Sequence, residues 1–177
     1  MYTKLNCSPE MASSSIPSSS SIPTQKHHAF LSFRGEDTHN IFVGHLYKGL
    51  DQAGVRTFRD KEKLQKGDLM SPQLFQAIEE SSISIVILSE NYADSSWCMN
   101  ELGKIIDCQD KKNQKVHPVF YNVEPSNVRK QLGNFVKGFN SLSSKFQQEP
   151  EKIKKWKLAL EEICNASGFH LNKAENK

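Results

Sequence analysis

The chain has 177 residues, of which 37% are hydrophobic and 24% are charged, and its formal net charge is +3. This length suits a single domain, because domains most often have about 100–150 residues. The longest apolar runs are far shorter than the about 20 residues that a membrane-spanning helix needs, so a transmembrane protein is excluded. The mild charge alone does not indicate nucleic-acid binding, which usually requires a concentrated basic face.

The first 26 residues differ in composition from the rest. The segment MASSSIPSSSSIPTQK is rich in serine and proline and offers little apolar surface to bury. It also lacks the apolar core of a signal peptide. We interpret residues 1–26 as a disordered leader, with Met1 or Met11 as the true start, and residues 172–177 as a flexible tail. A transit peptide is the alternative, although the segment contains no arginine.

Strands and helices are expected to alternate along residues 27–171. ISIVIL is apolar on both faces, as in a parallel strand covered by helices on each side. Between such runs, apolar residues recur every three or four positions, which predicts amphipathic helices. In chain order we expect a strand at 29–33, a helix at 38–53, strands at 55–58 and 83–88 with a helix from Ser71-Pro72 between them, a helix at 97–113, a strand at 116–121, helices at 132–146 and 150–166, and a short strand near 167–171.

Several single residues predict where these elements end. Thr38 is expected to cap the first helix, and Gly54 to follow its last turn. Ser71 and Pro72 have the order typical of a helix start, with serine at the N-cap and proline at the first helical position. Pro118 cannot donate a hydrogen bond to a ladder, so its strand is expected near an edge of the sheet.

The alternation of strands and helices predicts an α/β fold with a mostly parallel sheet. Right-handed crossovers favour the flavodoxin-like fold. This fold has three layers, in which helices cover both faces of a five-stranded parallel sheet of order 2-1-3-4-5. In such sheets the ligand crevice lies beyond the carboxyl ends of the strands, here between the first and third strands. The loops after these two strands therefore bring Phe33, Arg34, Trp97 and Glu101 together.

Two common proteins with this fold, and one class of site, do not fit the sequence. A receiver domain needs clustered acids after the first strand and an aspartate ending the third, where this chain has Phe33-Arg34 and Ser89. A flavodoxin needs a phosphate loop rich in serine, threonine and glycine, for which FRGED is too acidic. The cysteines and histidines are scattered without metal-ligand spacing, which is typical of reduced intracellular thiols and predicts no metal site.

The chain resembles the plant TIR domain, found alone or at the N-terminus of intracellular immune receptors. The resemblance spans almost all of residues 27–171, which we interpret as the domain, and it implies the same flavodoxin-like fold. It also implies a cytoplasmic protein, with the nucleus as a second location. The matching stretches are FLSFRGEDT (30–38), GHLYKGL (44–50), AIEES (77–81), LSENYADSSWCMNEL (88–102), PVFYNVEPSNVR (118–129) and GFHL (168–171).

This resemblance implies an enzyme that takes NAD+ as its substrate and requires no metal. Many plant TIR domains cleave the nicotinamide–ribose bond of NAD+ and release nicotinamide with ADP-ribose or its cyclic variants. The family's catalytic glutamate corresponds to Glu101 in WCMNEL. The alternative is that Glu101 only complements the dipole of its helix. A lone carboxylate is sufficient for the reaction, because nicotinamide leaves as a neutral molecule and needs no general acid.

A set of residues resembles the family's NAD-binding pocket. Phe33 would offer a ring face, and Arg34 a fork of donors for phosphate or ribose oxygens. The alternatives are core packing for Phe33 and an ion pair with Glu36 or Asp37 for Arg34. The implied binding residues are Phe33, Arg34, Gly35, Gly67, Ser96 and Trp97.

The remaining pocket residues also have alternatives. Trp97 would stack on a base or be buried against the sheet, and Ser96 would touch the ligand or cap its helix. Gly67 lies in 60–70, which resembles the family's mobile loop over the pocket and is otherwise a solvated charged loop.

Activity in the family depends on self-association, so a homo-oligomer and contacts with other TIR proteins are implied. One interface uses a Ser-His pair on the first helix, which here reads Gly44-His45, so the serine is missing. The other interface corresponds to a surface around Arg129, Lys130, Gly133 and the last helix. Downstream immune signalling proteins would sense the nucleotide product, and no membrane partner is expected.

Two other functions fit the sequence. One is a non-catalytic scaffold that acts through TIR–TIR contacts. The other is a nucleic-acid-dependent nuclease or cyclic-nucleotide synthase, whose binding would fall steeply with salt. The basic cluster of the last helix would then contact nucleic acid, although nearby glutamates favour a solvated face. Its residues are Lys152, Lys154, Lys155 and Lys157.

Overall fold

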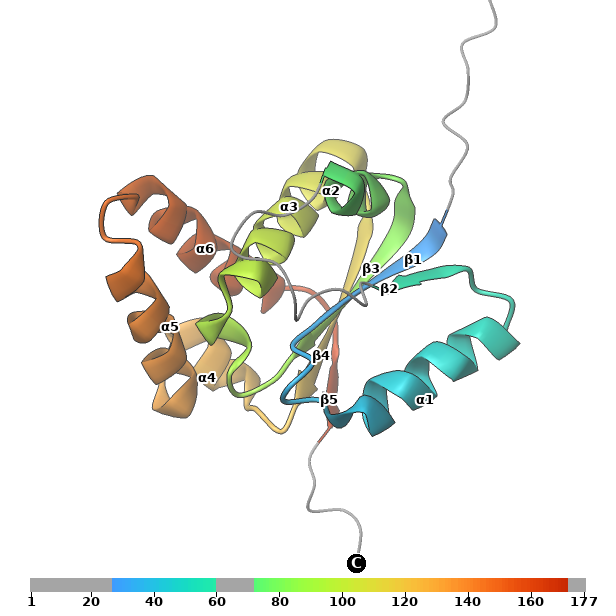
Figure 1. Cartoon of the computed structure of the whole chain (residues 1–177), viewed down its shortest axis with the longest axis horizontal. Coiled ribbons are helices and arrows are strands. Elements are labelled where there is room, and N and C mark those ends of the chain that lie inside the picture. Colours follow the sequence, from blue (N-terminus) through green and yellow to red (C-terminus); the bar gives the residue numbers. More distant parts are fainter. Residues whose placement is uncertain (1–26, 60–71, 172–177) are drawn as a thin grey trace, which may run out of the picture.

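The computed structural model describes residues 27–59 and 72–171, with the side chains of His39 and Asn40 excepted (Figure 1). The expected leader, the tail, Ser71 and the loop that contains Gly67 lie outside the described residues. The strands are β1 (His27–Phe33), β2 (Thr57–Arg59), β3 (Ser81–Leu88), β4 (Lys115–Tyr121) and β5 (Phe169–Leu171). The helices are α1 (His39–Gln52), α2 (Pro72–Glu79), the 3-10 helix η1 (Tyr92–Asp94), α3 (Ser96–Lys112), α4 (Pro125–Lys130), α5 (Gly133–Lys145) and α6 (Pro150–Ile163).

The five strands form one parallel sheet in the order β2-β1-β3-β4-β5. This confirms the predicted fold class and strand order. The side chains of β1 alternate between two hydrophobic clusters, with Phe30 in the larger one and Leu31 and Phe33 in the smaller one. Both faces of β1 are therefore buried, as expected of a central parallel strand.

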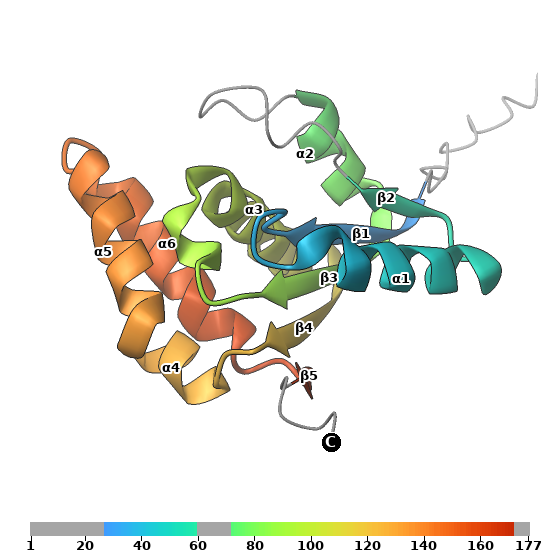
Figure 2. The ribbon, with the colours of Figure 1, turned by 60° about the horizontal axis from the view of Figure 1, so that its bottom comes forward.

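The two faces of the sheet are covered unequally. Among the described helices, α1 alone covers one face, where Val43 packs on Leu31, Ile87 and Val119. Figure 2 shows α1 on one side of the sheet, with α2, α3 and α6 on the other. The larger cluster lies on that second side and contains Trp156, which is 1% exposed and donates its indole N–H to Asn100 Oδ1. The second side thus holds most of the core.

The helix ends agree with the sequence in part. Gly54 follows α1 in the left-handed region, at φ 75°, as predicted. Thr38 occupies the N-cap position of α1, but its side chain caps nothing; its hydroxyl donates to the carbonyl oxygen of Arg34 instead (3.0 Å). The cap of α3 is Ser95, whose side chain accepts from the backbone N–H of Cys98, and Ser96 is the first helical residue. The predicted N-cap position of Thr38 is therefore confirmed, although without a side-chain cap, and the capping alternative for Ser96 is wrong.

Two short elements were not expected from the sequence. The helix α4 has six residues, and η1 has three. Neither is long enough to show an apolar period, although Pro125 stands at the favoured first position of α4.

The strand that contains Pro118 lies near an edge of the sheet, as predicted, because β4 is second from one edge, between β3 and the edge strand β5. Strand β5 pairs with β4 at Val119, Phe120 and Tyr121. Pro118 therefore stands just before the stretch that β5 pairs with. There Gly168 approaches the proline so closely that an added Cβ would lie 2.4 Å from the carbonyl oxygen of Pro118 and 2.6 Å from its Cγ.

Gly168→Ala is expected to displace β5 and to lower the free energy of unfolding by about 1–3 kcal/mol, because neither the backbone oxygen nor the proline ring can turn aside. Urea denaturation followed by circular dichroism measures the change. Gly49→Ala is the control, since a Cβ at Gly49 in α1 meets no atom within 4 Å and alanine is the better helix former. A Gly168→Ala protein as stable as the wild type would contradict the expectation.

Candidate active site at the carboxyl edge of the sheet

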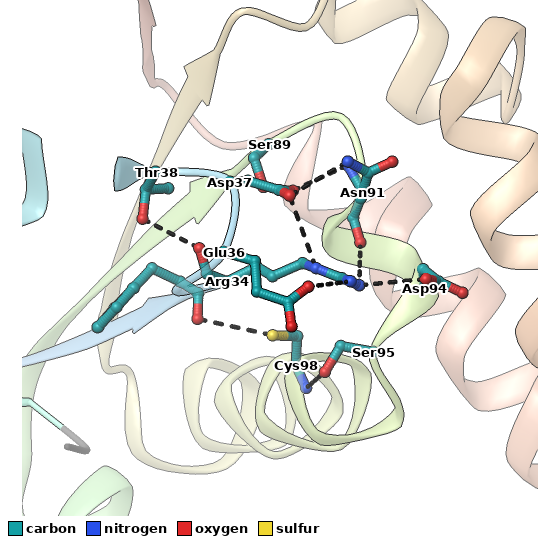
Figure 3. A network of polar contacts seen from close by, with 10 residues as sticks. Arg34, Glu36, Asp37, Thr38, Ser89, Asn91, Asp94, Ser95 and Cys98 are labelled. Atoms are coloured by element: carbon teal, nitrogen blue, oxygen red, sulfur yellow. Dashed lines mark hydrogen bonds and ion pairs between the residues drawn. The ribbon is translucent and has the colours of Figure 1, made fainter. Parts of the chain in front are cut away.

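The site predicted at the switch in strand order lies at the carboxyl ends of β1 and β3. These neighbouring strands are in register to their ends, with Phe33 opposite Ile87. The loop after β1 therefore lies beside the loop that joins β3 to η1 and α3. Both loops carry polar side chains, and Figure 3 shows the hydrogen bonds and ion pairs between them.

Asp37 joins the two loops. Its carboxylate accepts hydrogen bonds from Ser89 Oγ (2.6 Å), from the backbone N–H of Asn91 (3.0 Å) and from Asn91 Nδ2 (3.1 Å). The Asp37 side chain is 11% exposed, so these donors replace most of its water. Charge-assisted bonds of this kind are stronger than neutral ones and hold the loop after β1 against the end of β3.

Arg34 lies among three carboxylates (Figure 3). Its guanidinium contacts Glu36 at 2.8 Å, Asp94 at 3.4 Å and Asp37 at 3.6 Å, and it also donates to the carbonyl oxygen of Asn91. Burial acts to lower the pKa of Arg34, but the hydrogen bond to Glu36 and the negative charges outweigh it, so the pKa is raised overall. The ion-pair alternative for Arg34 therefore describes its setting, with Asp94 as an additional partner.

Glu101 is fully buried on the side of α3 that faces β1. Its Oε2 accepts from Ser32 Oγ at 2.5 Å, and its Oε1 accepts from the indole N–H of Trp97 at 3.0 Å. The carboxylate thus has a donor on each oxygen, one from the sheet and one from its own helix. A preorganised carboxylate in a water-excluded setting can stabilise positive charge that develops on a bound molecule.

A buried tyrosine lies behind this carboxylate. Tyr92 in η1 places its Oη 2.8 Å from Ser32 Oγ and 3.1 Å from the carbonyl oxygen of Cys98. Burial raises the pKa of Tyr92 well above its usual value, and negative charge on Cys98 and Glu101 raises it further. Tyr92 is therefore a neutral hydroxyl that keeps its proton.

The other predicted pocket residues lie near this site in different settings. Phe33 is 8% exposed and belongs to the smaller hydrophobic cluster, which agrees with its core-packing alternative. Trp97 is half-buried and packs against the larger cluster while its N–H holds Glu101. Gly35 is half-buried, and an added Cβ there would meet nothing within 4 Å. Ser96 is buried at the start of α3.

Sequence reasoning missed Ser32 and Tyr92. Ser32 had a signal, because it is the one polar residue in the apolar run AFLSF and directly precedes Phe33 at the end of the strand. Tyr92 had none, since a tyrosine in a polar loop is not expected to be 0% exposed.

The residues predicted for self-association lie on two separate surfaces. Gly44 and His45 are on α1, and a Cβ at Gly44 would meet no atom within 4 Å. Arg129 and Lys130 end α4, where Arg129 donates to the carbonyl oxygen of Cys164 and to Asn165 Oδ1. Gly133 begins α5 in the left-handed region, at φ 63°.

Residues 27–59 and 72–171 contain no cluster of three or more histidine, cysteine or acidic side chains placed to hold a metal ion. None of the helices in these same ranges has the length and apolar character needed to cross a membrane.

Three comparisons with known proteins point in one direction. The family model described as "TIR domain" matches residues 26–177. Disease resistance protein RPV1 of Vitis rotundifolia is 48% identical over 159 residues, which cover 89% of this chain and 11% of that protein. TMV resistance protein N of Nicotiana glutinosa is 46% identical over 153 residues, covering 86% and 13%. The chain thus spans only about a tenth of the length of these relatives.

A solved structure gives the same result. The TIR domains in the structure of the activated Roq1 resistosome, described as directly recognising the pathogen effector XopQ, superpose with a TM-score of 0.77 at 42% identity. The match covers 85% of this chain and 90% of that one.

Proposed function

The chain belongs to the TIR domain family, and on that premise we propose that it is an NAD+ nucleosidase in plant immune signalling that is active when it self-associates. The observation that supports the proposal most is the buried Glu101 carboxylate, whose two oxygens are oriented by Ser32 and Trp97. The immune role is supported by the disease resistance proteins that share the domain.

The proposed reaction breaks the bond between C1′ of the ribose and the nicotinamide nitrogen. The bonding electron pair leaves with nicotinamide, which becomes neutral, and the ribose acquires oxocarbenium character. Glu101 stabilises this positive charge electrostatically. Water then attacks C1′ and loses a proton, giving ADP-ribose, or a nucleophile within the same molecule attacks and closes a cyclic product.

The residues around Glu101 would form the NAD-binding part of the site. We assign Trp97 to its wall, since its indole N–H already contacts the carboxylate. Arg34 would meet phosphate or ribose oxygens by exchanging one of its carboxylate partners, of which Glu36 is the most exposed at 65%. Phe33, Gly35, Gly67 and Ser96 remain predicted members of the same pocket.

The test is the release of nicotinamide from NAD+ by the purified 177-residue chain at rising protein concentration. Activity that increases more than linearly with protein concentration is expected, because assembly would complete the site. The control is the same chain with Glu101 replaced by alanine, shown to be folded and equally self-associated. If the wild type releases no nicotinamide even when crowded into assemblies, the domain acts as a scaffold and the proposal fails.

Gly44→Ser is expected to strengthen self-association, because it restores the Ser-His pair that the family uses on this helix. Nothing lies within 4 Å of a Cβ at Gly44, so the serine fits without strain. One new hydrogen bond across an interface would tighten dimerisation by about 10-fold. Sedimentation velocity at several concentrations measures the change. Gly49→Ser is the matched control on the same helix, with equal space around it; an equal gain for both variants would contradict a specific contact.

A further inference from the structure

A chain of buried oxygens connects Glu101 to the 3-10 helix. It runs from Glu101 Oε2 to Ser32 Oγ (2.5 Å), then to Tyr92 Oη (2.8 Å), and ends at the carbonyl oxygen of Cys98 (3.1 Å). Ser32, Tyr92 and Glu101 are each 0% exposed. We propose that Ser32 and Tyr92 are positioning residues that set the orientation of the Glu101 carboxylate. The catalytic consequence rests on the proposed NAD+ cleavage, but the orientation itself does not.

Packing alone does not explain the two hydroxyl groups. Ser32 stands in the apolar run of β1, and Tyr92 belongs to the larger hydrophobic cluster. At such positions alanine and phenylalanine would give similar packing without burying a polar group, which has a free-energy cost unless it is hydrogen-bonded. Within residues 27–59 and 72–171, the bonds that stabilise these hydroxyls join them to each other, to Glu101 and to Cys98.

The proton count indicates the direction of the bonds. When Glu101 is ionised, both ends of the chain are acceptors, and two hydroxyl protons are available for three contacts. Ser32 therefore donates to the carboxylate, and the single hydroxyl proton of Tyr92 lies between two acceptors, Ser32 Oγ at 2.8 Å and the carbonyl oxygen of Cys98 at 3.1 Å. Successive hydrogen bonds polarise one another. Tyr92 therefore acts on Glu101 through Ser32, without touching it.

The hydrogen bond from Ser32 connects the Glu101 carboxylate to strand β1 of the sheet. A second donor, Trp97, is four residues before Glu101 on the same helix and moves with it. Ser32 belongs to β1, and Tyr92 belongs to η1, which packs next to α3. The angle of the carboxylate relative to the carboxyl edge of the sheet is therefore set by the Ser32–Tyr92 pair.

The first test does not depend on activity. The chain has two tryptophans, and their indole N–H groups bond to different partners, Trp97 to Glu101 and Trp156 to Asn100. In a ¹⁵N-labelled protein, Ser32→Ala and Tyr92→Phe are each expected to shift the Trp97 indole signal and to leave the Trp156 signal in place. The matched control is Ser84→Ala, which removes an equally buried serine hydroxyl bonded to Gln114 and should move neither signal.

The second test is kinetic. Ser32→Ala is expected to lower kcat for nicotinamide release by about 10- to 100-fold, the range for losing a hydrogen bond to a charged group. KM should change by less than about twofold, because the interaction favours the transition state over bound substrate. Tyr92→Phe should lower kcat by a smaller factor. The double variant should be no slower than Ser32→Ala, because Tyr92 acts only through Ser32.

Each outcome supports or overturns the positioning role of Ser32 and Tyr92. Unchanged Trp97 signals in both single variants would overturn the positioning role. So would a double variant whose loss equals the product of the two single losses, since that would mean independent effects. If the wild type does not cleave NAD+, the proposed function fails, and the indole signals alone still show whether the pair orients Glu101.

Discussion

Glu101→Gln is expected to reduce nicotinamide release from NAD+ by about 10²–10³-fold, the loss typical of removing one preorganised electrostatic contact. The substitution keeps the size of the side chain and removes only its negative charge. The amide oxygen can still accept from Trp97, and the amide nitrogen can donate to Ser32 Oγ, which is then free to donate to Tyr92. The surrounding bonds therefore survive with the Ser32 bond reversed.

Because these hydrogen bonds are preserved, a loss of activity can be assigned to the loss of the negative charge. Glu101→Gln is expected to be at least as stable as the wild type in urea, because a buried charge carries a desolvation penalty that a buried amide largely avoids. Glu90→Gln is the matched control: Glu90 is exposed in the loop after β3, and its loss should leave activity unchanged. A Glu101→Gln protein that is stable and cleaves NAD+ at the wild-type rate would show that Glu101 is not the catalytic group.

The fold was predictable from the sequence because its signals are long and redundant. β3 is apolar on both faces for most of its eight residues, and α3 keeps an amphipathic period over seventeen. Short elements such as α4 give no such pattern. Pro118 indicates only that its strand lies near an edge, because it stands in β4 just before the three residues that pair with β5.

The position of the candidate site could be predicted from the sequence, whereas most of its side-chain contacts could not. Strand order alone brings the ends of β1 and β3 together, so Arg34 and Glu101 could be assigned to one edge of the sheet. The sequence favoured Ser96 as the cap of α3, but the cap is its neighbour Ser95, whose extended backbone (ψ 113°) lets its side-chain oxygen accept from the N–H of Cys98. The hydrogen bond between Ser32 and Tyr92 joins residues sixty positions apart, and a single sequence gives no signal that predicts such a contact.

Asp37→Ala is expected to lower the free energy of unfolding by about 1–3 kcal/mol, because it removes a carboxylate that is 11% exposed and leaves the buried hydroxyl of Ser89 without its acceptor. The hydroxyl of Ser89 and two N–H groups of Asn91 all donate to this carboxylate, and Arg34 loses one of its counter-charges. The loop after β1 would separate from the end of β3. Urea denaturation at constant ionic strength measures the change.

The control for this substitution is its neighbour Glu36. Glu36→Ala removes the same charge and also an ion pair with Arg34, at 2.8 Å, but the Glu36 side chain is 65% exposed. Exposed pairs contribute about 0–1 kcal/mol, so a small loss is expected. If the two variants lost equal stability, net charge or Arg34 pairing would be responsible. A large loss for Asp37→Ala alone would mean that the hydrogen bonds of Asp37 hold the two loops of the site together.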